Sequence, residues 1–302
     1  TDGITCDMIC NNDSACTWLR DNYKVDCTKP GAQEYYNSCF DMYAQWGVDF
    51  VKIDDLARPY HKGEIELIRK AIDQCGRPIV LSISPGETPL DKVDHVKEHA
   101  NMWRTVDDFW DNWDLLKAMF ERCDVWQRQV SAGCFPDCDM IPIGKIGKAF
   151  NALRTSNFSY DEERLLMSLW CIFRSPLILG GELNELAKEE TDIITNEHIL
   201  YMNTSCHGAC QIFRDDNECA WITFDNNSAS FFVALFNLSD TIQVVTVSPD
   251  ELALYLRDEG ITLSESFNLF DCWESKTLGN IDSSGSIFVT LNPHSASVLR
   301  IN

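Results

Sequence analysis

The chain has 302 residues, of which 45% are hydrophobic and 11% aromatic, a composition typical of a globular protein with a substantial core. Its formal net charge is −22 and it contains no block of basic residues. Nucleic acid and anionic membranes are bound through clustered lysine and arginine, so neither is expected as a partner. No apolar run reaches the roughly 18 residues that a membrane-spanning helix needs.

Helix-like and strand-like segments alternate between residues 30 and 195. In chain order we expect a helix over 31–46, a strand over 48–54, a helix over 64–75, a strand over 78–84, a helix over 91–99, a strand over 102–106, a helix over 110–126, a strand over 139–144, a helix that begins at a Ser159–Glu162 capping box, and a strand over 176–180. Such alternation predicts parallel βα units. Five strands are fewer than the eight that a closed (β/α)8 barrel requires.

Period-two strands replace this pattern in the last third of the chain. The expected strands cover 219–224, 230–238, 241–248, 267–273, 286–292 and 297–302. Turn residues separate them, which predicts an antiparallel β-sandwich. We therefore expect a partial (β/α)8 catalytic domain over residues 1–200 and a C-terminal sandwich domain over 206–302.

Lys52 and Asp54 lie two residues apart on one predicted strand and so share one of its faces. Asp54 sits at the carboxyl end of that strand, which is the end that carries the active site in parallel βα barrels. A functional carboxylate is one interpretation. A structural Lys52–Asp54 ion pair is the other.

A second group of charged residues, Arg104, Asp107 and Asp108, ends the strand over 102–106. Glycoside hydrolysis needs two carboxylates on opposite sides of the scissile bond, one of them ionised and one protonated at the start. Two strand ends can supply them. The alternative is that Asp107 or Asp108 only caps the following helix.

Five segments resemble glycoside hydrolase family 27, the α-galactosidase and α-N-acetylgalactosaminidase family, in order from about Pro30 onward. They are WGVDFVKIDD, WRTVDDFWDNW, GCFPDCDMIPIG, LWCIFRSPLILGGEL and NPHSASVLRI. The resemblance implies a (β/α)8 TIM barrel that lacks about its first three strands, followed by an antiparallel β-sandwich. It also implies that Asp54 is the nucleophile and Asp108 the acid/base.

The same resemblance implies the rest of the site and the reaction. Substrate-contacting side chains are expected at Lys52, Arg104, Ser84 and Asp139. The implied activity is that of a retaining exo-glycosidase that removes terminal α-D-galactosyl residues from an oligosaccharide or glycan through a covalent glycosyl-enzyme. Neither a metal nor another cofactor is expected, and a homo-oligomer is left open.

The sequence departs from the family pattern after the strand over 78–84. The family usually has a C-E-W-type segment there that contacts the 2-position of the sugar, whereas this chain has Ser84-Pro85-Gly86. An α-N-acetylgalactosaminide and a β-L-arabinopyranoside, which lacks only the C6 group of an α-galactoside, therefore remain alternative substrates. A non-catalytic sugar-binding fragment is the alternative from another class, since the first barrel strands have no counterpart.

Cysteines and histidines raise the question of metal binding. Three cysteine pairs have C-x3-C spacing, namely Cys6/Cys10, Cys134/Cys138 and Cys206/Cys210. They lack histidines at zinc-finger spacing, so we expect short-loop disulfides or free thiols instead. His95 and His99 share a helix face, but the nearby Lys92 and Lys97 predict a solvated face rather than a metal site. The 14 cysteines and five N-x-S/T sequons predict a secreted or extracytoplasmic protein.

Overall fold

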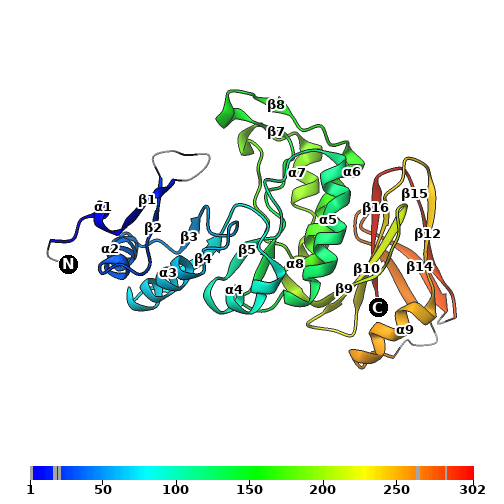
Figure 1. Cartoon of the computed structure of the whole chain (residues 1–302). Helices are drawn as coiled ribbons and strands as arrows, with labels where there is room; N and C mark the ends of the chain where they lie inside the picture. Colours follow the sequence, from blue (N-terminus) through cyan, green and yellow to red (C-terminus); the bar gives the residue numbers. More distant parts are fainter. Residues whose placement is uncertain (1–2, 16–18, 20–21, 263–265, 283) are drawn as a thin grey trace. The chain divides into compact units, whose positions relative to one another are not determined.

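The computed structural model describes residues 3–15, 19, 22–262, 266–282 and 284–302. The chain divides into two compact units (Figure 1). The first comprises residues 1–108 and 131–137, and the second comprises 109–130 and 138–302. Among the described residues, no helix is both long and apolar enough to cross a membrane.

The first unit is built on a parallel sheet with the strand order β3-β4-β5-β6. Its elements are α1 (Cys6–Ile9), β1 (Cys10–Ala15), β2 (Tyr23–Val25), α2 (Ala32–Gln45), β3 (Phe50–Ile53), α3 (Lys62–Gln74), β4 (Val80–Ile83), α4 (Val93–His99), β5 (Met102–Arg104) and β6 (Phe135–Asp137). In Figure 1 the labelled elements from α2 to β5 alternate between helix and strand along the blue to cyan part of the chain. The predicted βα alternation is confirmed for this part.

Burial explains why these segments form a helix and a strand. α3 places Ile65, Ile68 and Ile72 on one buried face, at the spacing of an amphipathic helix. In β4, Leu81 and Ile83 are fully buried, as expected for a strand between two neighbours. β3 is an edge strand of the sheet that the described residues form, and its residues alternate between exposed and half-buried.

The fourth parallel strand differs from the prediction. It covers 135–137, whereas the predicted strands over 139–144 and 176–180 meet only at one isolated parallel bridge, between Ile141 and Leu179. Pro142 cannot donate a ladder hydrogen bond, and Gly144 turns the chain with a φ of 78°. These two residues limit that segment to a single bridge.

The second unit combines helices with an antiparallel sandwich. Its elements are α5 (Trp113–Trp126), β7 (Lys145–Ile146), β8 (Arg154–Thr155), α6 (Tyr160–Phe173), α7 (Lys188–Ile194), α8 (Glu197–Ser205), β9 (Cys206–Arg214), β10 (Glu218–Asp225), β11 (Phe231–Asn237), β12 (Gln243–Val247), α9 (Pro249–Asp258), β13 (Ser266–Asp271), β14 (Lys276–Asp282), β15 (Ile287–Leu291) and β16 (Ser295–Ile301). A six-stranded sheet has the order β14-β13-β16-β11-β10-β9, and β12 pairs with β15. Alternate residues of these strands, such as Val233 and Val245, form the shared core.

All six predicted strands of the last third are present, and the predicted helix beginning at Ser159 is α6 with its capping box. The sequence analysis missed β9, β14 and α9. The signal for α9 is present, because Ser248 and Glu251 form a capping box around Pro249 at the first helical position.

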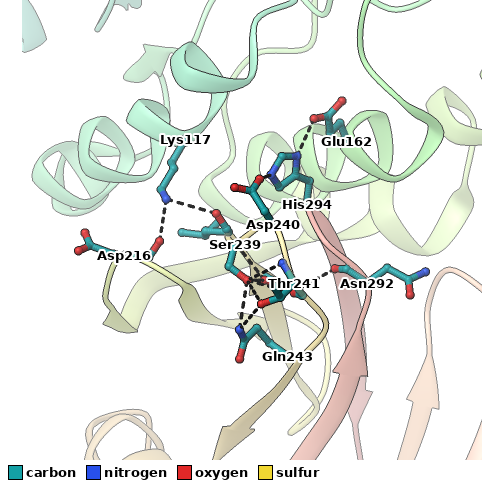
Figure 2. A network of polar contacts seen from close by, with 11 residues as sticks. Lys117, Glu162, Asp216, Ser239, Asp240, Thr241, Gln243, Asn292 and His294 are labelled. Atoms are coloured by element: carbon teal, nitrogen blue, oxygen red, sulfur yellow. Dashed lines mark hydrogen bonds and ion pairs between the residues drawn. The ribbon is translucent and has the colours of Figure 1, made fainter.

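Polar contacts join the sandwich loops to α5 and α6 within the second unit (Figure 2). His294 contacts Glu162 Oε1 through Nδ1 at 2.9 Å and Asp240 Oδ1 through Nε2 at 3.0 Å. Its ring stacks on Trp113 with the centroids 3.6 Å apart. Lys117 Nζ donates to the carbonyl oxygens of Asp216 and Leu238 at 2.7 and 3.2 Å. The loops are thereby fixed to the helices by hydrogen bonds as well as by apolar packing.

The 13 cysteines among the described residues all carry free thiols. The Sγ atom of Cys138 lies 3.7 Å from that of Cys123, and both side chains are buried. Of the two alternatives, short-loop disulfides and free thiols, the structure therefore shows free thiols in this part of the chain. Asn237, the acceptor of one sequon, is fully buried, and its Nδ2 group, which carries two hydrogens, lies within 3.1 Å of three backbone carbonyl oxygens. The secreted or extracytoplasmic location stays a prediction.

Candidate active site

The candidate site lies at the carboxyl ends of β3, β4 and β5 in the first unit. The register pairs Ile53 of β3 with Ile83 of β4, and Ile83 with Trp103 of β5. One residue further along each strand, Asp54, Ser84 and Arg104 therefore form one row across the sheet. Parallel strands bring their carboxyl ends to the same edge, which is why residues far apart in sequence meet there.

Asp54 is held directly by its neighbour in this row. The buried hydroxyl of Ser84 donates to Asp54 Oδ1 at 2.6 Å. Backbone bonds fix both residues, because Ser84 N donates to Ile53 O at 3.0 Å and Leu56 N donates to Ser84 O at 3.2 Å. The hydrogen bond orients the carboxylate, while the Asp54 residue as a whole stays exposed.

Lys52 lies on the same exposed side of β3 as Asp54. The described residues form no ion pair between Lys52 and Asp54, so the structural alternative for this pair is wrong there. Lys52 is level with Ser82 of β4 in the register. Its ammonium group is available to a ligand at the strand ends.

The second carboxylate is held by a buried cation. Arg104 is 2% exposed and its Nη2 lies 3.0 Å from Oδ1 of Asp108, whose side chain is 70% exposed. An ion pair with an exposed partner adds little to stability. Its main effect is positional, because the rigid guanidinium fixes the direction of a carboxylate that faces solvent.

Asp107 and Asp108 do not cap the next helix. Asn112 caps α5, and its side chain accepts a hydrogen bond from Leu115 N at 3.1 Å. Asp107 pairs instead with Arg58 at 2.6 Å. This contact ties the loop that follows Asp54 to the loop that carries Asp108.

Gly86 belongs to the segment in which the sequence departs from the family pattern, and the structure explains its identity. It has a φ of 89°, and a Cβ atom there would lie 3.0 Å from Cβ of Arg58 and 3.5 Å from Oδ1 of Asp107. A larger residue would strain the backbone and crowd the Arg58–Asp107 pair. Sequence reasoning missed Arg58, and its only signal was a basic residue in the loop after a strand-end aspartate.

Asp139 lies in the second unit. Its Oδ2 accepts a hydrogen bond from Phe109 N at 2.7 Å, and its backbone carbonyl accepts one from Trp170 Nε1 at 3.2 Å. The carboxylate therefore fixes the backbone of the residue directly after Asp108. A contact of Asp139 with sugar stays a prediction, as do the substrate contacts of Lys52, Ser84 and Arg104.

Among the described residues, one group could hold a metal ion, namely Glu66, His95 and His99. None of the three belongs to the row of strand ends described above. Together with Lys52 and Asp108, the row supplies two carboxylates, a hydroxyl, an ammonium and a guanidinium. Such groups suit acid/base and nucleophilic chemistry on a neutral, hydroxyl-rich ligand.

Comparison with known proteins identifies the architecture. A family model described as alpha galactosidase A matches residues 19–205, and one described as the alpha galactosidase C-terminal beta sandwich domain matches residues 221–301. Among curated relatives, alpha-galactosidase 3 of Arabidopsis thaliana is 25% identical over 88% of this chain and 58% of its own length. Alpha-N-acetylgalactosaminidase of Gallus gallus is 24% identical over 83% of this chain and 61% of its own length.

A solved structure is more similar. The glycoside hydrolase family 27 β-L-arabinopyranosidase of Geobacillus stearothermophilus is 42% identical, with a TM-score of 0.90 over 98% of this chain and 67% of that one. The chain spans about 60% of the length of the two curated relatives. The predicted fold class is confirmed: the parallel sheet is the part of a (β/α)8 barrel that this chain contains, and a β-sandwich follows it. The chain belongs to the alpha-galactosidase family of glycoside hydrolases, family 27.

Proposed function

We propose that the protein is a retaining exo-glycosidase, with Asp54 as the nucleophile and Asp108 as the acid/base. The observation that carries this proposal is the pair of oriented carboxylates at the same end of β3 and β5, with only β4 between them. Neighbouring strands lie about 4.8 Å apart, so the two strand ends are about 10 Å apart. Two aspartate side chains reaching into that gap can approach the roughly 5–5.5 Å separation of retaining enzymes.

The reaction follows from the contacts of the two carboxylates. Ser84 engages Oδ1 of Asp54, which leaves Oδ2 to attack the anomeric carbon and form a glycosyl ester. Asp108 gives its proton to the leaving oxygen as the glycosidic bond breaks. It then takes a proton from water, whose oxygen attacks the anomeric carbon and releases Asp54. No cofactor takes part in either step.

Cations assist both halves of the reaction. Arg104 holds the carboxyl group of Asp108 in place. Lys52 lies on the exposed side of β3 beside Asp54, where an ammonium group can donate to sugar hydroxyls.

The substrate is a terminal sugar of galacto configuration. An α-D-galactosyl residue is the first candidate. A β-L-arabinopyranosyl residue is the second, and one observation favours it: the arabinopyranosidase is 42% identical to this chain, whereas the curated α-galactosidase and α-N-acetylgalactosaminidase are 25% and 24% identical. The two sugars differ only in the C6 group, so the choice depends on side chains near that carbon.

The test is a comparison of kcat/KM for aryl β-L-arabinopyranoside, aryl α-D-galactopyranoside and aryl N-acetyl-α-D-galactosaminide. We expect turnover of the first two and little of the third. NMR of the first product formed should show the anomeric configuration of the substrate. A folded protein that binds these sugars but turns over none of them would contradict the proposal and indicate a non-catalytic sugar-binding protein.

A further inference from the structure

A group of potential metal ligands lies on α3 and α4, outside the candidate active site. One carboxylate oxygen of Glu66 and one ring nitrogen from each of His95 and His99 lie within 4.8 Å of one another. The two rings are stacked, with centroids 4.1 Å apart and an angle of 16° between their planes. The i, i+4 spacing on α4 brings the rings together, and the packing of α3 beside α4 adds the carboxylate.

In both histidines, Nδ1 has a hydrogen-bond partner other than the three proposed ligand side chains. His99 Nδ1 lies 2.8 Å from the carbonyl oxygen of His95. A carbonyl only accepts, so Nδ1 donates in this contact, and Nε2 is the ring nitrogen that can bind a metal. His95 Nδ1 contacts the hydroxyl of Tyr60 at 2.6 Å, and its Nε2 lies 3.3 Å from Glu66 Oε1. Metal-binding histidines are oriented in this way by a second partner at the other nitrogen.

His95 and His99 are both half-buried. The side chain of His95 is 13% exposed, so it does not lie on the solvated face that the sequence suggested. Lys62 Nζ lies 3.8 Å from Glu66 Oε1 and the lysine side chain is 63% exposed, so a bound ion can displace it.

We propose that Glu66, His95 and His99 bind one divalent ion of the zinc class, with water completing the coordination. Two imidazole nitrogens and one carboxylate oxygen are a donor set suited to zinc. Ligand atoms around a tetrahedral zinc lie about 3.3 Å apart, given zinc–ligand distances of about 2.0–2.1 Å. The His95–Glu66 pair already has this spacing. The other pairs, at most 4.8 Å apart, reach it through side-chain rotation.

The expected consequence is mechanical. α3 connects β3 to β4, and α4 connects β4 to β5. A metal ion that joins the two helices braces both connections to β4, the strand that ends at Ser84. The ion therefore stabilises the first unit without touching the proposed reaction.

The test is a zinc titration of the chelator-treated protein by calorimetry, together with melting curves in the presence and absence of zinc. Glu66→Gln and His99→Ala are the cluster variants. Glu259→Gln is the matched control, because Glu259 also pairs with a histidine, His207, at 3.0 Å. We expect the wild type and the control each to bind one zinc ion more than either cluster variant. Zinc should also raise the melting temperature of the wild type and the control by at least about 3 °C.

The cysteines could also bind zinc. The absorption spectrum of bound cobalt(II) distinguishes cysteine ligands from the proposed site. Sulfur ligands give intense thiolate-to-metal absorption in the near ultraviolet, whereas the proposed site gives only weaker visible bands. Equal zinc stoichiometry and equal melting shifts in all four proteins would overturn the proposal. If circular dichroism shows that His99→Ala is unfolded, Glu66→Gln decides alone, since it keeps the shape of a half-buried side chain and removes only the charge.

Discussion

The carboxylates at the strand ends of the first unit differ from the buried carboxylates of the second. Asp54 and Asp108 are exposed, and each is held by a contact with a buried side chain, Ser84 for Asp54 and Arg104 for Asp108. Asp225, at the end of β10, is buried and accepts hydrogen bonds from four groups. They are Tyr201 Oη, Asn227 N, Ser228 Oγ and Arg300 Nη2.

The difference separates two uses of a carboxylate. A group with its acceptor positions filled stabilises the fold but has no lone pair for a substrate. A group oriented by one neighbour and otherwise open to solvent can act on a ligand. A shifted pKa does not make this distinction here, because the carboxyl whose pKa is raised to about 7 is Glu163 in α6, outside the row of strand ends.

The largest effect is expected for Asp54→Asn, which removes the nucleophile. We expect kcat/KM to fall by about 10⁴-fold or more, and the melting temperature to stay within about 2 °C of wild type. Asp49→Asn is the control, because Asp49 is an exposed aspartate next to the other end of β3. Normal activity of Asp54→Asn would break the comparison and remove Asp54 from the mechanism.

The next effect tests the neighbouring pair of aspartates. Asp108→Asn should lower activity by about 10²–10⁴-fold on substrates with poor leaving groups. The loss should be smaller with an activated aryl leaving group, which needs little protonation. Asp107→Asn removes the contact with Arg58 instead and should lose far less activity. Equal losses in both variants would assign Asp108 a structural role.

Asp225→Asn tests the buried, structural carboxylate of the comparison. Burial raises the pKa of Asp225, but hydrogen bonds from Asn227, Ser228 and Tyr201 and the charge of Arg300 outweigh it, so the pKa lies below 3.8. The stability from this lowered pKa is present above about pH 4 and is lost as the pH falls through the folded-state value.

We expect Asp225→Asn to lower the free energy of unfolding at pH 7 by about 3 kcal/mol, measured by urea denaturation. The activity of each folded molecule should not change. Asp240→Asn, at an exposed aspartate of the second unit, is the control and should change stability by less than about 1 kcal/mol. A selective loss of kcat in Asp225→Asn would contradict the structural assignment.

For Glu163→Gln we expect an effect on stability of the opposite sign, confined to neutral and higher pH. Burial, and then the charge of Glu190, raise the pKa of Glu163 from 4.5 to about 7. Between these values the folded state binds the proton more tightly than the unfolded state, so stability falls as the pH rises through this window. Glu163→Gln should remove that slope and stabilise the protein above pH 7 by up to about 3 kcal/mol. Glu189→Gln, at an exposed position of α7, should keep the wild-type slope in urea titrations at pH 5, 6 and 7.5.

Most elements of the fold could be predicted from periodicity alone. The isoleucines of α3 recur at helical spacing, and strands β12 and β15 of the sandwich alternate with a period of two, because each pattern matches the geometry of one buried face. The prediction was wrong at 139–144, where Pro142 and Gly144 interrupt an apolar run that otherwise reads as a strand. Proline and glycine limit pairing locally, and hydrophobicity does not report this.

The sequence by itself determined the candidate carboxylates, their places after strands, and the family to which they point. Only the tertiary structure decided what surrounds them: the register that sets Ser84 beside Asp54, the buried Arg104 that holds Asp108, and the four donors around Asp225. It also decided that Glu66 lies beside His95 and His99, which the sequence separates by about 30 positions. Local patterns depend on neighbours along the chain, whereas these contacts depend on strand order and helix packing, which no single segment encodes.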